Sequence, residues 1–434
     1  MQASLFSRLE ISNWRQFQSV EIEVHPKLTI ITGANGSGKS TLLSFFAKHF
    51  GYHRNLLATP KTKGGQTSFA TGIFDILKKT ILSKKTEIPW QGHLIGRVGY
   101  STGEFADLTL PAHADLNFSV NINGQLLVEG IHIDSHTLPN IYRPVTDFPA
   151  SPPAVYGIGA GLSSEYMNFY SHGRLMQGGL VHIKMTLIQM SIFGYGNATM
   201  EPIPELIDLF KGFEEKLRLI LPKSIGFKRL IIRSPEVLLS THSGDFLIDA
   251  ASGGVIKLIE VAWQLFFFSQ GKGSFVITFD EPENHLHPSM QKLFIPNIIS
   301  AFPNAQLIVV THSPFIISSL QNSAVYVLRY EDAEIVSDEA DDDGSIKGLM
   351  GTKVIAERLD TINKAGTASE ILRNVLGITA TIPDWAEDKI SQIADKYRGL
   401  ELSDDILSQL FDELEREGLA SSYPNAVSSL TRAQ

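Results

Sequence analysis

The chain has 434 residues, a formal net charge of -9 and no cysteine, and 43% of its residues are hydrophobic against 19% charged. These values are typical of a globular protein of about two or three domains, and they exclude disulfides and cysteine-ligated zinc. The acidic balance argues against a protein that coats nucleic acid through bulk positive charge, although the basic clusters at 78–85 and 228–233 leave DNA or RNA contact open.

No targeting or membrane segment is apparent in the sequence. The N-terminus lacks the charged and apolar regions of a signal peptide. The most apolar run, 255–268, is too short to span a bilayer and is interrupted by Lys257 and Glu260. We therefore expect a cytoplasmic protein with no membrane partner, and the lack of cysteine fits a reducing compartment.

The first predicted elements lead to a glycine-rich loop. Residues 5–14 and 17–33 show alternating and then continuous apolar residues, which predict two strands and a buried third strand that ends at Gly33. The segment 33–40 reads GANGSGKS and matches G-x-x-x-x-G-K-[S/T], and an apolar helix is predicted after it. A strand before the loop and a helix after it are the context that a phosphate-binding loop requires.

The loop residues have the chemistry to bind a nucleoside triphosphate. Glycines at positions 33, 36 and 38 allow turns in which successive backbone N–H groups point at an anion. Lys39 supplies a point charge for the terminal phosphates, the Ser40 hydroxyl is suited to bind Mg²⁺, and the helix N-terminus favours negative charge. The pattern therefore predicts a bound triphosphate with Mg²⁺ and does not define the base.

Four segments of different texture follow one another along the chain. Residues 1–50 and 225–335 alternate strands and helices, which indicates βαβ units, an α/β fold class and a largely parallel sheet. Residues 51–224 carry turns rich in glycine, proline and asparagine and are interpreted as an α+β insertion. Residues 336–434 contain an acidic linker and helical spacing, which predict a small helical tail. Individual helices are predicted over 71–84, 204–221, 253–269 and 288–301.

An acidic pair ends a predicted buried strand in the segment SFVITFDE. Asp280 is placed to reach a metal ion through its water shell, and Glu281 is placed to polarise an attacking water. Because ionised carboxylates at the end of a buried strand need a cation, a catalytic role is favoured over a structural one.

A histidine, His312, follows another predicted buried strand. Parallel strands bring their carboxyl ends to one edge of a sheet, so His312, Glu281 and the phosphate loop are expected to meet there. A histidine at this edge can hydrogen-bond the γ-phosphate, although a lone histidine is more often a satisfied core or surface residue.

The segment Ser252-Gly253-Gly254 opens a predicted helix and forms a second anion-binding helix N-terminus. A chain with one phosphate loop has no evident use for a second such site. The economical interpretation is that Ser252 and Gly253 contact the nucleotide of a second copy, which predicts a homodimer closed around the triphosphate.

The order TGANGSGKST, SGG before a helix, TFDEPENHLHP and VVTHSPF resembles the ABC-type ATPases of the SMC, RecF and OLD branch. In texture it is similar to stand-alone ATPases of bacterial anti-phage defence systems. The resemblance covers residues 1–50 and 225–330. It implies an ABC-type ATPase head with a mixed, largely parallel sheet, Mg²⁺-dependent ATP hydrolysis, and an ATP-sandwich dimer or larger oligomer.

The resemblance also implies a role for each matching residue. Glu281, His312 and Lys39 are implied as catalytic residues, and Ser40 and Asp280 as magnesium ligands. The implied nucleotide contacts are Arg15 of the NWR segment, the Walker A residues Asn35, Gly36, Ser37, Gly38, Lys39, Ser40 and Thr41, and in trans the signature residues Ser252 and Gly253.

The sequence departs from the family pattern in two places. Val255 and Ile256 follow SGG where the family usually has glutamine or arginine, which predicts a weaker trans contact and slow turnover. The Q-loop glutamine of the family has no clear counterpart, and Gln177 is a weak candidate. His285 and His287 are more simply loop residues of the dimer interface than metal ligands.

Three functions are open on these grounds. The first is an ATP-gated dimer that controls a partner effector, a nuclease or toxin, in anti-phage defence. The second is an OLD-like ATPase with its own nuclease, whose only acidic cluster, 338–343, lies in a predicted linker. The third is a RecF-like DNA-repair ATPase, which predicts ATP-dependent duplex binding and is disfavoured by the acidic net charge.

Overall fold

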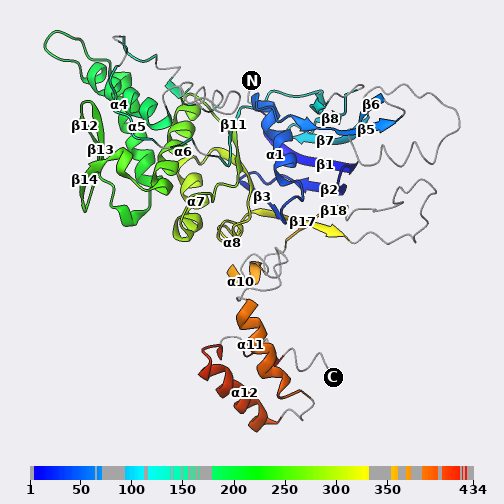
Figure 1. The fold of residues 1–434 in the computed structure, drawn as a ribbon. Coiled ribbons are helices and arrows are strands. Elements are labelled where there is room, and N and C mark those ends of the chain that lie inside the picture. The colour runs from blue at the N-terminus through cyan, green and yellow to red at the C-terminus, as the bar shows by residue number, and fades with distance from the viewer. Residues whose placement is uncertain are drawn as a thin grey trace. The chain divides into compact units, whose positions relative to one another are not determined.

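An eleven-stranded mixed sheet organises the first of two structural units, Met1–Ala365, and helices form the second, Gly366–Gln434 (Figure 1). This computed structural model describes residues 4–63, 66–70, 93–111, 116–136, 178–331, 353–359, 368–372, 384–398 and 403–420, with shorter pieces between 138 and 166 and residues 423, 426 and 427. The predicted helix 71–84, the candidate Gln177 and the acidic cluster 338–343 lie outside the described residues.

The strand order of the main sheet is β10-β8-β7-β1-β2-β18-β17-β3-β16-β15-β11. The strands are β1 (Phe6–Trp14), β2 (Phe17–Glu23), β3 (Leu28–Gly33), β7 (Leu94–Tyr100), β8 (Phe105–Thr109), β10 (Asn121–Asn123), β11 (Gly130–Ile133), β15 (Phe275–Asp280), β16 (Ala305–Val310), β17 (Ala324–Glu331) and β18 (Lys353–Arg358). The run β17-β3-β16-β15-β11 is parallel, whereas the run β2-β1-β7-β8-β10 is antiparallel. The predicted α/β fold with a mixed sheet is confirmed.

Burial explains why the central strands pair in parallel. Every residue of β3, β15 and β16 is buried, as expected for strands covered on both faces, whereas β1 and β2 alternate between buried and exposed positions. Val310 at the end of β16 is level with Ile31 of β3 on one side and with Asp280 of β15 on the other. The register therefore brings the carboxyl ends of these three strands to one edge of the sheet.

Helices cover the parallel strands and extend away from them. They are α1 (Lys39–Ala47), α4 (Gly179–Tyr195), α5 (Pro204–Ile220), α6 (Gly253–Ser269), α7 (Pro288–Ala301) and α8 (Pro314–Ile317). The helices predicted over 204–221, 253–269 and 288–301 are confirmed as α5, α6 and α7. None of the helices within the described part of the chain combines the length and apolarity that crossing a membrane requires.

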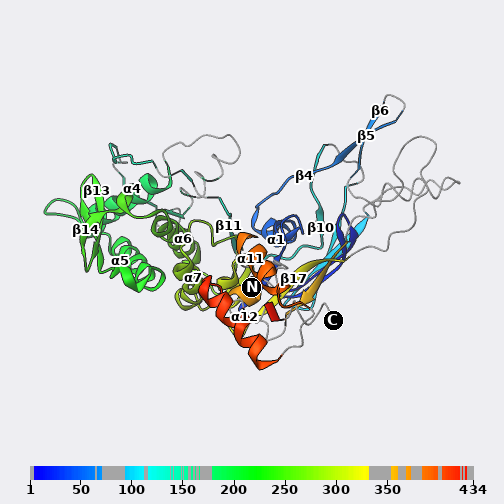
Figure 2. The same cartoon turned by 60° about the horizontal axis from the view of Figure 1, so that its bottom comes forward.

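A small antiparallel sheet, β12 (Arg229–Arg233), β13 (Glu236–Thr241) and β14 (Gly244–Leu247), groups with α4 and α5 at one end of the first unit (Figure 2). Two short pairs, β4 (Leu56–Leu57) with β9 (Asn117–Phe118) and β5 (Thr59–Lys63) with β6 (Gln66–Ala70), lie toward the other end. The SGG helix α6 follows β14 through a short 3-10 turn, Ile248–Ala250.

The structure differs from the predicted segment boundaries in two places. Strands β7, β8, β10 and β11, all inside the predicted insertion 51–224, belong to the main sheet, where β7 covers the outer edge of β1. Strand β18, inside the predicted tail 336–434, lies between β17 and β2. An unpaired strand edge favours pairing with any compatible segment, so distant parts of the chain complete the sheet. The boundaries at 50 and 335 therefore do not separate structural units.

The second unit contains α10 (Ala368–Glu370), α11 (Asp384–Asp395) and α12 (Asp404–Arg416). Its longer helices are amphipathic and enclose a small core that includes Ile390, Ile393, Leu410 and Leu414. The side chain of Ser403 caps α12 by accepting a hydrogen bond from the Ile406 amide. Helical spacing with N-cap residues had predicted this part of the tail.

Acidification is expected to destabilise the first unit through His49. Its ring nitrogens bond the Phe45 carbonyl at 3.0 Å and the Tyr100 hydroxyl at 2.8 Å, and burial lowers its pKa to about 4. In the unfolded chain His49 has its ordinary pKa of about 6.5, so below that pH the unfolded chain binds more protons than the folded one. The free energy of unfolding therefore falls by about 2 kcal/mol between about pH 7.5 and pH 5. Urea unfolding at both pH values should show a smaller loss in His49→Gln, and equal losses in both proteins would contradict the prediction.

Candidate functional site

The loop between β3 and α1 has a backbone that only glycine accommodates at its key positions. Gly33, Gly36 and Gly38 have positive φ angles of 144°, 81° and 97°. A Cβ atom on Gly33 would lie 2.5 Å from the Leu328 carbonyl oxygen, and one on Gly38 would lie 2.3 Å from the Phe17 ring. The glycine spacing is therefore required by the tight packing of the loop as well as by its turns.

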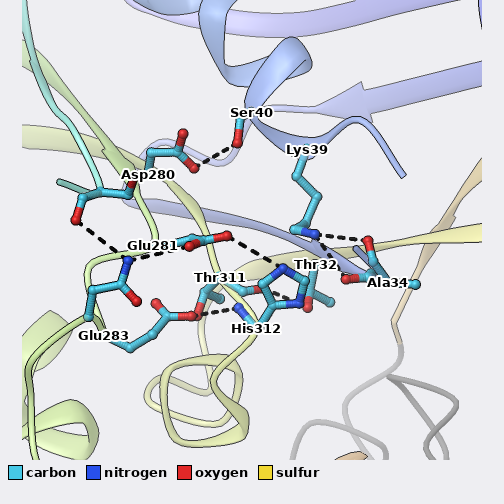
Figure 3. Close-up of polar contacts among 12 residues, drawn as sticks. Thr32, Ala34, Lys39, Ser40, Asp280, Glu281, Glu283, Thr311 and His312 are labelled. Atoms are coloured by element: carbon cyan, nitrogen blue, oxygen red, sulfur yellow. Dashed lines mark hydrogen bonds and ion pairs between the residues drawn. The ribbon is translucent and has the colours of Figure 1, made fainter. Parts of the chain in front are cut away.

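Lys39 begins α1 with its ammonium group directed back over the loop (Figure 3). Its Nζ donates to the Gly33 carbonyl at 3.1 Å and the Ala34 carbonyl at 3.0 Å, and the residue is 5% exposed. Burial lowers the pKa of Lys39, and the nearby carboxylates of Glu281 and Asp280 oppose this shift. A cation is thus held at the loop without an ion pair within the described residues.

Two groups of the loop, the N-terminus of α1 and the Ser37 hydroxyl, have no side-chain hydrogen-bond partner among the described residues. Among the described residues, no side chain caps the N-terminus of α1, where Gly38 is left-handed. The Ser37 hydroxyl is fully buried and has no hydrogen-bond partner in the described chain. Asn35 and Gly36 lie exposed at the tip of the loop, and Thr41 lies in the first turn of α1. This arrangement suits an anion bound over the helix N-terminus.

The acidic pair meets α1 at the end of β15. Asp280 Oδ1 accepts a hydrogen bond from Ser40 Oγ at 3.0 Å (Figure 3). Burial, and to a smaller extent the charge of Glu281, raises the pKa of Asp280 although the Ser40 hydrogen bond lowers it. A hydroxyl and a carboxylate oxygen side by side are ligands that Mg²⁺ accepts, so the pair fits a magnesium site.

Glu281 adopts a strained backbone conformation directly after β15. Its φ angle is +45°, and its amide donates to the Val310 carbonyl at 2.9 Å. Its carboxylate lies between His312, with Oε1 at 3.5 Å from Nε2, and Asn284, whose Nδ2 donates to Oε2 at 3.4 Å. Left-handed non-glycine residues cost about 1–3 kcal/mol and cluster at functional sites, so the conformation points to a role for this carboxylate.

His312 follows β16 and is held in place by Glu283, which the sequence analysis missed. Glu283 Oε1 accepts hydrogen bonds from Thr311 Oγ1 at 2.8 Å, the His312 amide at 2.7 Å and the Ser313 amide at 3.1 Å (Figure 3). Burial lowers the pKa of His312, and the charge of Lys39 adds to that effect. The charge of Glu281 opposes this shift, but the net lowering of the pKa favours the neutral imidazole, which has a nitrogen lone pair. Glu283 belongs to the DEPE segment of the sequence, but only the fold shows that its carboxylate binds the residues that follow β16.

A cavity of about 450 Å³ extends from Ser40, Asp280 and Glu281 to a wall that the sequence analysis did not predict. The residues of this wall are Tyr52, Arg54, Asp134, Ser135 and His136. Asp134 directly follows β11, and Asp280 is the last residue of β15; Ile133 is level with Phe279, so the two carboxylates lie at the same edge of the sheet. A strand of four residues is too weak a sequence signal to reveal Asp134.

Asp134 supplies the carboxylate of this wall. Its Oδ2 accepts from the Tyr52 hydroxyl at 2.6 Å, and its Oδ1 lies 3.1 Å from His136 Nδ1. Burial raises its pKa, but the hydrogen bonds from Tyr52 and His136 outweigh that effect and bring the pKa down to about 2. Asp134 is therefore ionised throughout the neutral range and adds a negative charge to the wall that Arg54 also lines.

Arg15 and Ser252 are not brought to this cavity within one chain. Arg15 donates to the Leu57 carbonyl at 2.8 Å and lies over the rings of Trp14 and Phe118, whereas Gln16 is the residue that contacts the loop, at the Gly36 carbonyl. Ser252 precedes Gly253 at the start of α6 and lines a separate cavity of about 390 Å³.

The two histidines of the PENHLHP segment lie directly before α7. His287 caps α7 by accepting from the Ser289 amide at 3.3 Å, and His285 has a φ angle of +69°. In the part of the chain that the structure describes, no group of three or more histidine or acidic residues could hold a metal ion by itself.

Replacing Asp280 with asparagine is expected to raise the Mg²⁺ concentration needed for half-maximal hydrolysis roughly 10- to 100-fold, the usual cost of an outer ligand. The amide keeps the size of the side chain and loses the charge that faces Ser40. Phosphate release measured across a Mg²⁺ titration provides the check, with ATP binding in chelator as the matched control. An unchanged Mg²⁺ dependence would refute the assignment.

Two protein-family models each match part of the chain. Residues 149–318 match "AAA domain, putative AbiEii toxin, Type IV TA system", and residues 8–67 match "AAA domain". A curated relative from Escherichia coli, named "Retron Ec83 probable ATPase", is 26% identical over 137 residues, which is 32% of this chain and 20% of that protein. The match therefore spans about a fifth of the relative's length.

Solved structures with a similar arrangement include two SMC heads. The SMC head domain from Thermotoga maritima is 14% identical, with 83% of this chain and 100% of that chain covered and a TM-score of 0.39. The Smc head domain with an extended coiled coil, bound to the C-terminal domain of ScpA derived from Pyrococcus furiosus, is 16% identical, with 86% and 99% covered and a TM-score of 0.41.

Proposed function

We propose that this chain, which is similar to AAA and SMC-type ATPases, binds ATP with Mg²⁺ over its phosphate loop and hydrolyses it. One observation carries the proposal: the loop, the Asp280–Glu281 pair and His312 lie at the carboxyl ends of three adjacent parallel strands and meet at one edge of the sheet. Ligands bind at this edge in open parallel sheets. The test is ATP binding and phosphate release by the purified chain with Mg²⁺, and a chain that binds no ATP would overturn it.

Each side chain has a task that its contacts support. Lys39 would exchange its two loop carbonyls for the terminal phosphates. Ser40 and Asp280 would hold the metal ion, which would neutralise phosphate charge. Glu281 accepts a proton from the attacking water as general base. His312, in contact with Glu281 and neutral, hydrogen-bonds the γ-phosphate and links its presence to the base.

A second copy of the chain completes the site in this proposal. Ser252 is the N-cap residue of α6; its side chain makes no capping hydrogen bond in the described residues, and it lines a different cavity from Ser40. The N-terminus of α6 therefore has an anion-binding end and no phosphate of its own. An isologous dimer would give each ATP one phosphate loop and one Ser252. Sedimentation velocity with and without ATP tests this, because a chain that binds ATP as a monomer at every concentration contradicts it.

The dimer is proposed to control a partner effector, a nuclease or toxin, in anti-phage defence. Support comes from the similarity to the retron ATPase and from the motif order described above. The efficiency of plating of phage should be lower on cells that carry the chain with its neighbouring genes than on cells that carry a variant of the proposed site. Equal efficiencies would contradict the defence role. Metal-dependent cleavage of DNA by the chain alone would instead favour an ATPase with its own nuclease.

A further inference from the structure

Helix α6, which Ser252 precedes, contacts the wall of the proposed nucleotide cavity in the same chain. Helix α6 packs against β11, the edge strand that leads into Asp134, as Figure 1 also shows. Near the start of the helix, Lys257 Nζ donates to the Asp134 carbonyl oxygen at 3.4 Å. Just beyond its end, Lys272 pairs with Glu129, at the start of β11. The helix and the strand are thus linked by a lysine at each end.

The two lysines differ in their surroundings. Lys257 is 3% exposed, and burial lowers its pKa, whereas the Lys272 side chain is partly open to solvent. Glu260, one turn along α6, is also buried, attracts Lys257 and accepts a hydrogen bond from the Tyr166 hydroxyl at 2.8 Å. The charge of Glu260 offsets part of the desolvation cost of the buried Lys257. The Lys257 ammonium group also donates to the Asp134 carbonyl oxygen, so this one side chain joins α6 to the residue that follows β11.

We infer that Lys257 is a positioning residue that couples occupation of the nucleotide cavity to the placement of Ser252 for a second copy. The inference rests on the proposed function, because it requires ATP in the cavity that Asp134 lines. It assigns regulation to the same site: a chain would present its signature helix correctly only when its own nucleotide is bound.

The coupling has a physical route. The ionised Asp134 carboxylate faces the cavity with Ser40 and Asp280, so a bound triphosphate and metal ion change the electrostatic force on it. A displacement of the Asp134 backbone would move Lys257 through the hydrogen bond between the Asp134 carbonyl oxygen and Lys257 Nζ. Most residues of α6 from Gly254 onward are buried, whereas Ser252 and Gly253 are exposed, so displacement of the first turn is expected to displace Ser252 with it.

Hydrogen exchange of the amides at 253–258 tests the coupling, measured with and without Mg·ATP at protein concentrations where sedimentation shows a monomer. We expect ATP to slow exchange in this turn about fivefold or more in the unmodified chain. Lys257→Met should abolish the slowing while the dissociation constant for ATP changes by less than about twofold. Lys257→Arg, which keeps a donor, should retain it.

Lys272→Met is the matched control, because it cuts the same helix–strand pair at the end away from the cavity. It should retain the ATP-dependent slowing. If Lys257→Met lowers the melting temperature so far that the monomer is lost, Lys257→Gln replaces it with the same expectation. Slowing that persists in the Lys257 variants, or ATP binding without slowing in the unmodified chain, overturns the coupling alone. Absence of ATP binding overturns the proposed function as well.

Discussion

Replacing Glu281 with glutamine is expected to lower the rate of ATP hydrolysis roughly 100- to 10,000-fold, the usual contribution of a general base. Glutamine keeps the shape of the side chain and its contact with Asn284, but it cannot accept the proton of the attacking water. ATP binding should persist, because the phosphate loop and Lys39 are unchanged. Since hydrolysis is the step that opens the proposed dimer, the variant should accumulate as an ATP-bound dimer.

Single-turnover phosphate release and sedimentation velocity measure the two effects of Glu281→Gln separately. Glu21→Gln provides a matched control, because Glu21 is an exposed residue that pairs with Arg8 far along the sheet from the phosphate loop. The control should hydrolyse ATP as the unmodified chain does. A Glu281→Gln protein that hydrolyses ATP at the normal rate would exclude this carboxylate as the base, and one that binds ATP but stays monomeric would exclude the trans contact.

Replacing Lys39 with methionine is expected to weaken ATP binding roughly 10- to 150-fold, because a charged hydrogen bond contributes about 1.5–3 kcal/mol. The substitution removes the cation that lies over the Gly33 and Ala34 carbonyls and keeps most of the apolar stem. Folding stability should be unchanged or higher, since a buried and unpaired ammonium group costs desolvation energy. Affinity loss therefore cannot be attributed to unfolding.

Equilibrium titration with a fluorescent ATP analogue and a thermal melt of the same sample measure the outcome of Lys39→Met. Lys48→Met serves as the control, because Lys48 lies at the far end of α1 and bonds Ser119 and the Val120 carbonyl instead of the loop. The control should bind the analogue normally. Equal affinities of the Lys39 variant and the unmodified chain would show that the loop does not hold the triphosphate.

Local sequence signals predicted the elements that build the core of the site. A phosphate loop needs glycines at defined positions, and the structure shows Gly33 and Gly38 where a Cβ atom would collide with Leu328 and Phe17. Runs of apolar residues predicted β15 and β16, and the polar residues after them were therefore expected at one sheet edge. Their roles as base and phosphate sensor stay predictions until the variants are measured.

Other parts of the molecule depend on contacts between distant segments and left no comparable signal. β18 joins the sheet between β17 and β2, and β7 covers β1, because hydrogen-bonding edges are satisfied by whichever strands fit them. Asp134 follows a strand of only four residues, and hydrogen bonds from Tyr52, which is remote in sequence, and from His136 lower its pKa.

Sequence alone was enough to predict the glycine-rich loop after β3, the acidic pair at the end of β15 and the position of His312, because each depends on a strand, its end and the residues that directly follow. Only the tertiary structure showed the hydrogen bond from the His312 amide to Glu283, the cavity wall that includes Asp134, and the hydrogen bond from Lys257 to the Asp134 carbonyl. These features join residues far apart in the chain, and their energies depend on burial and distance, which no local pattern of residues encodes.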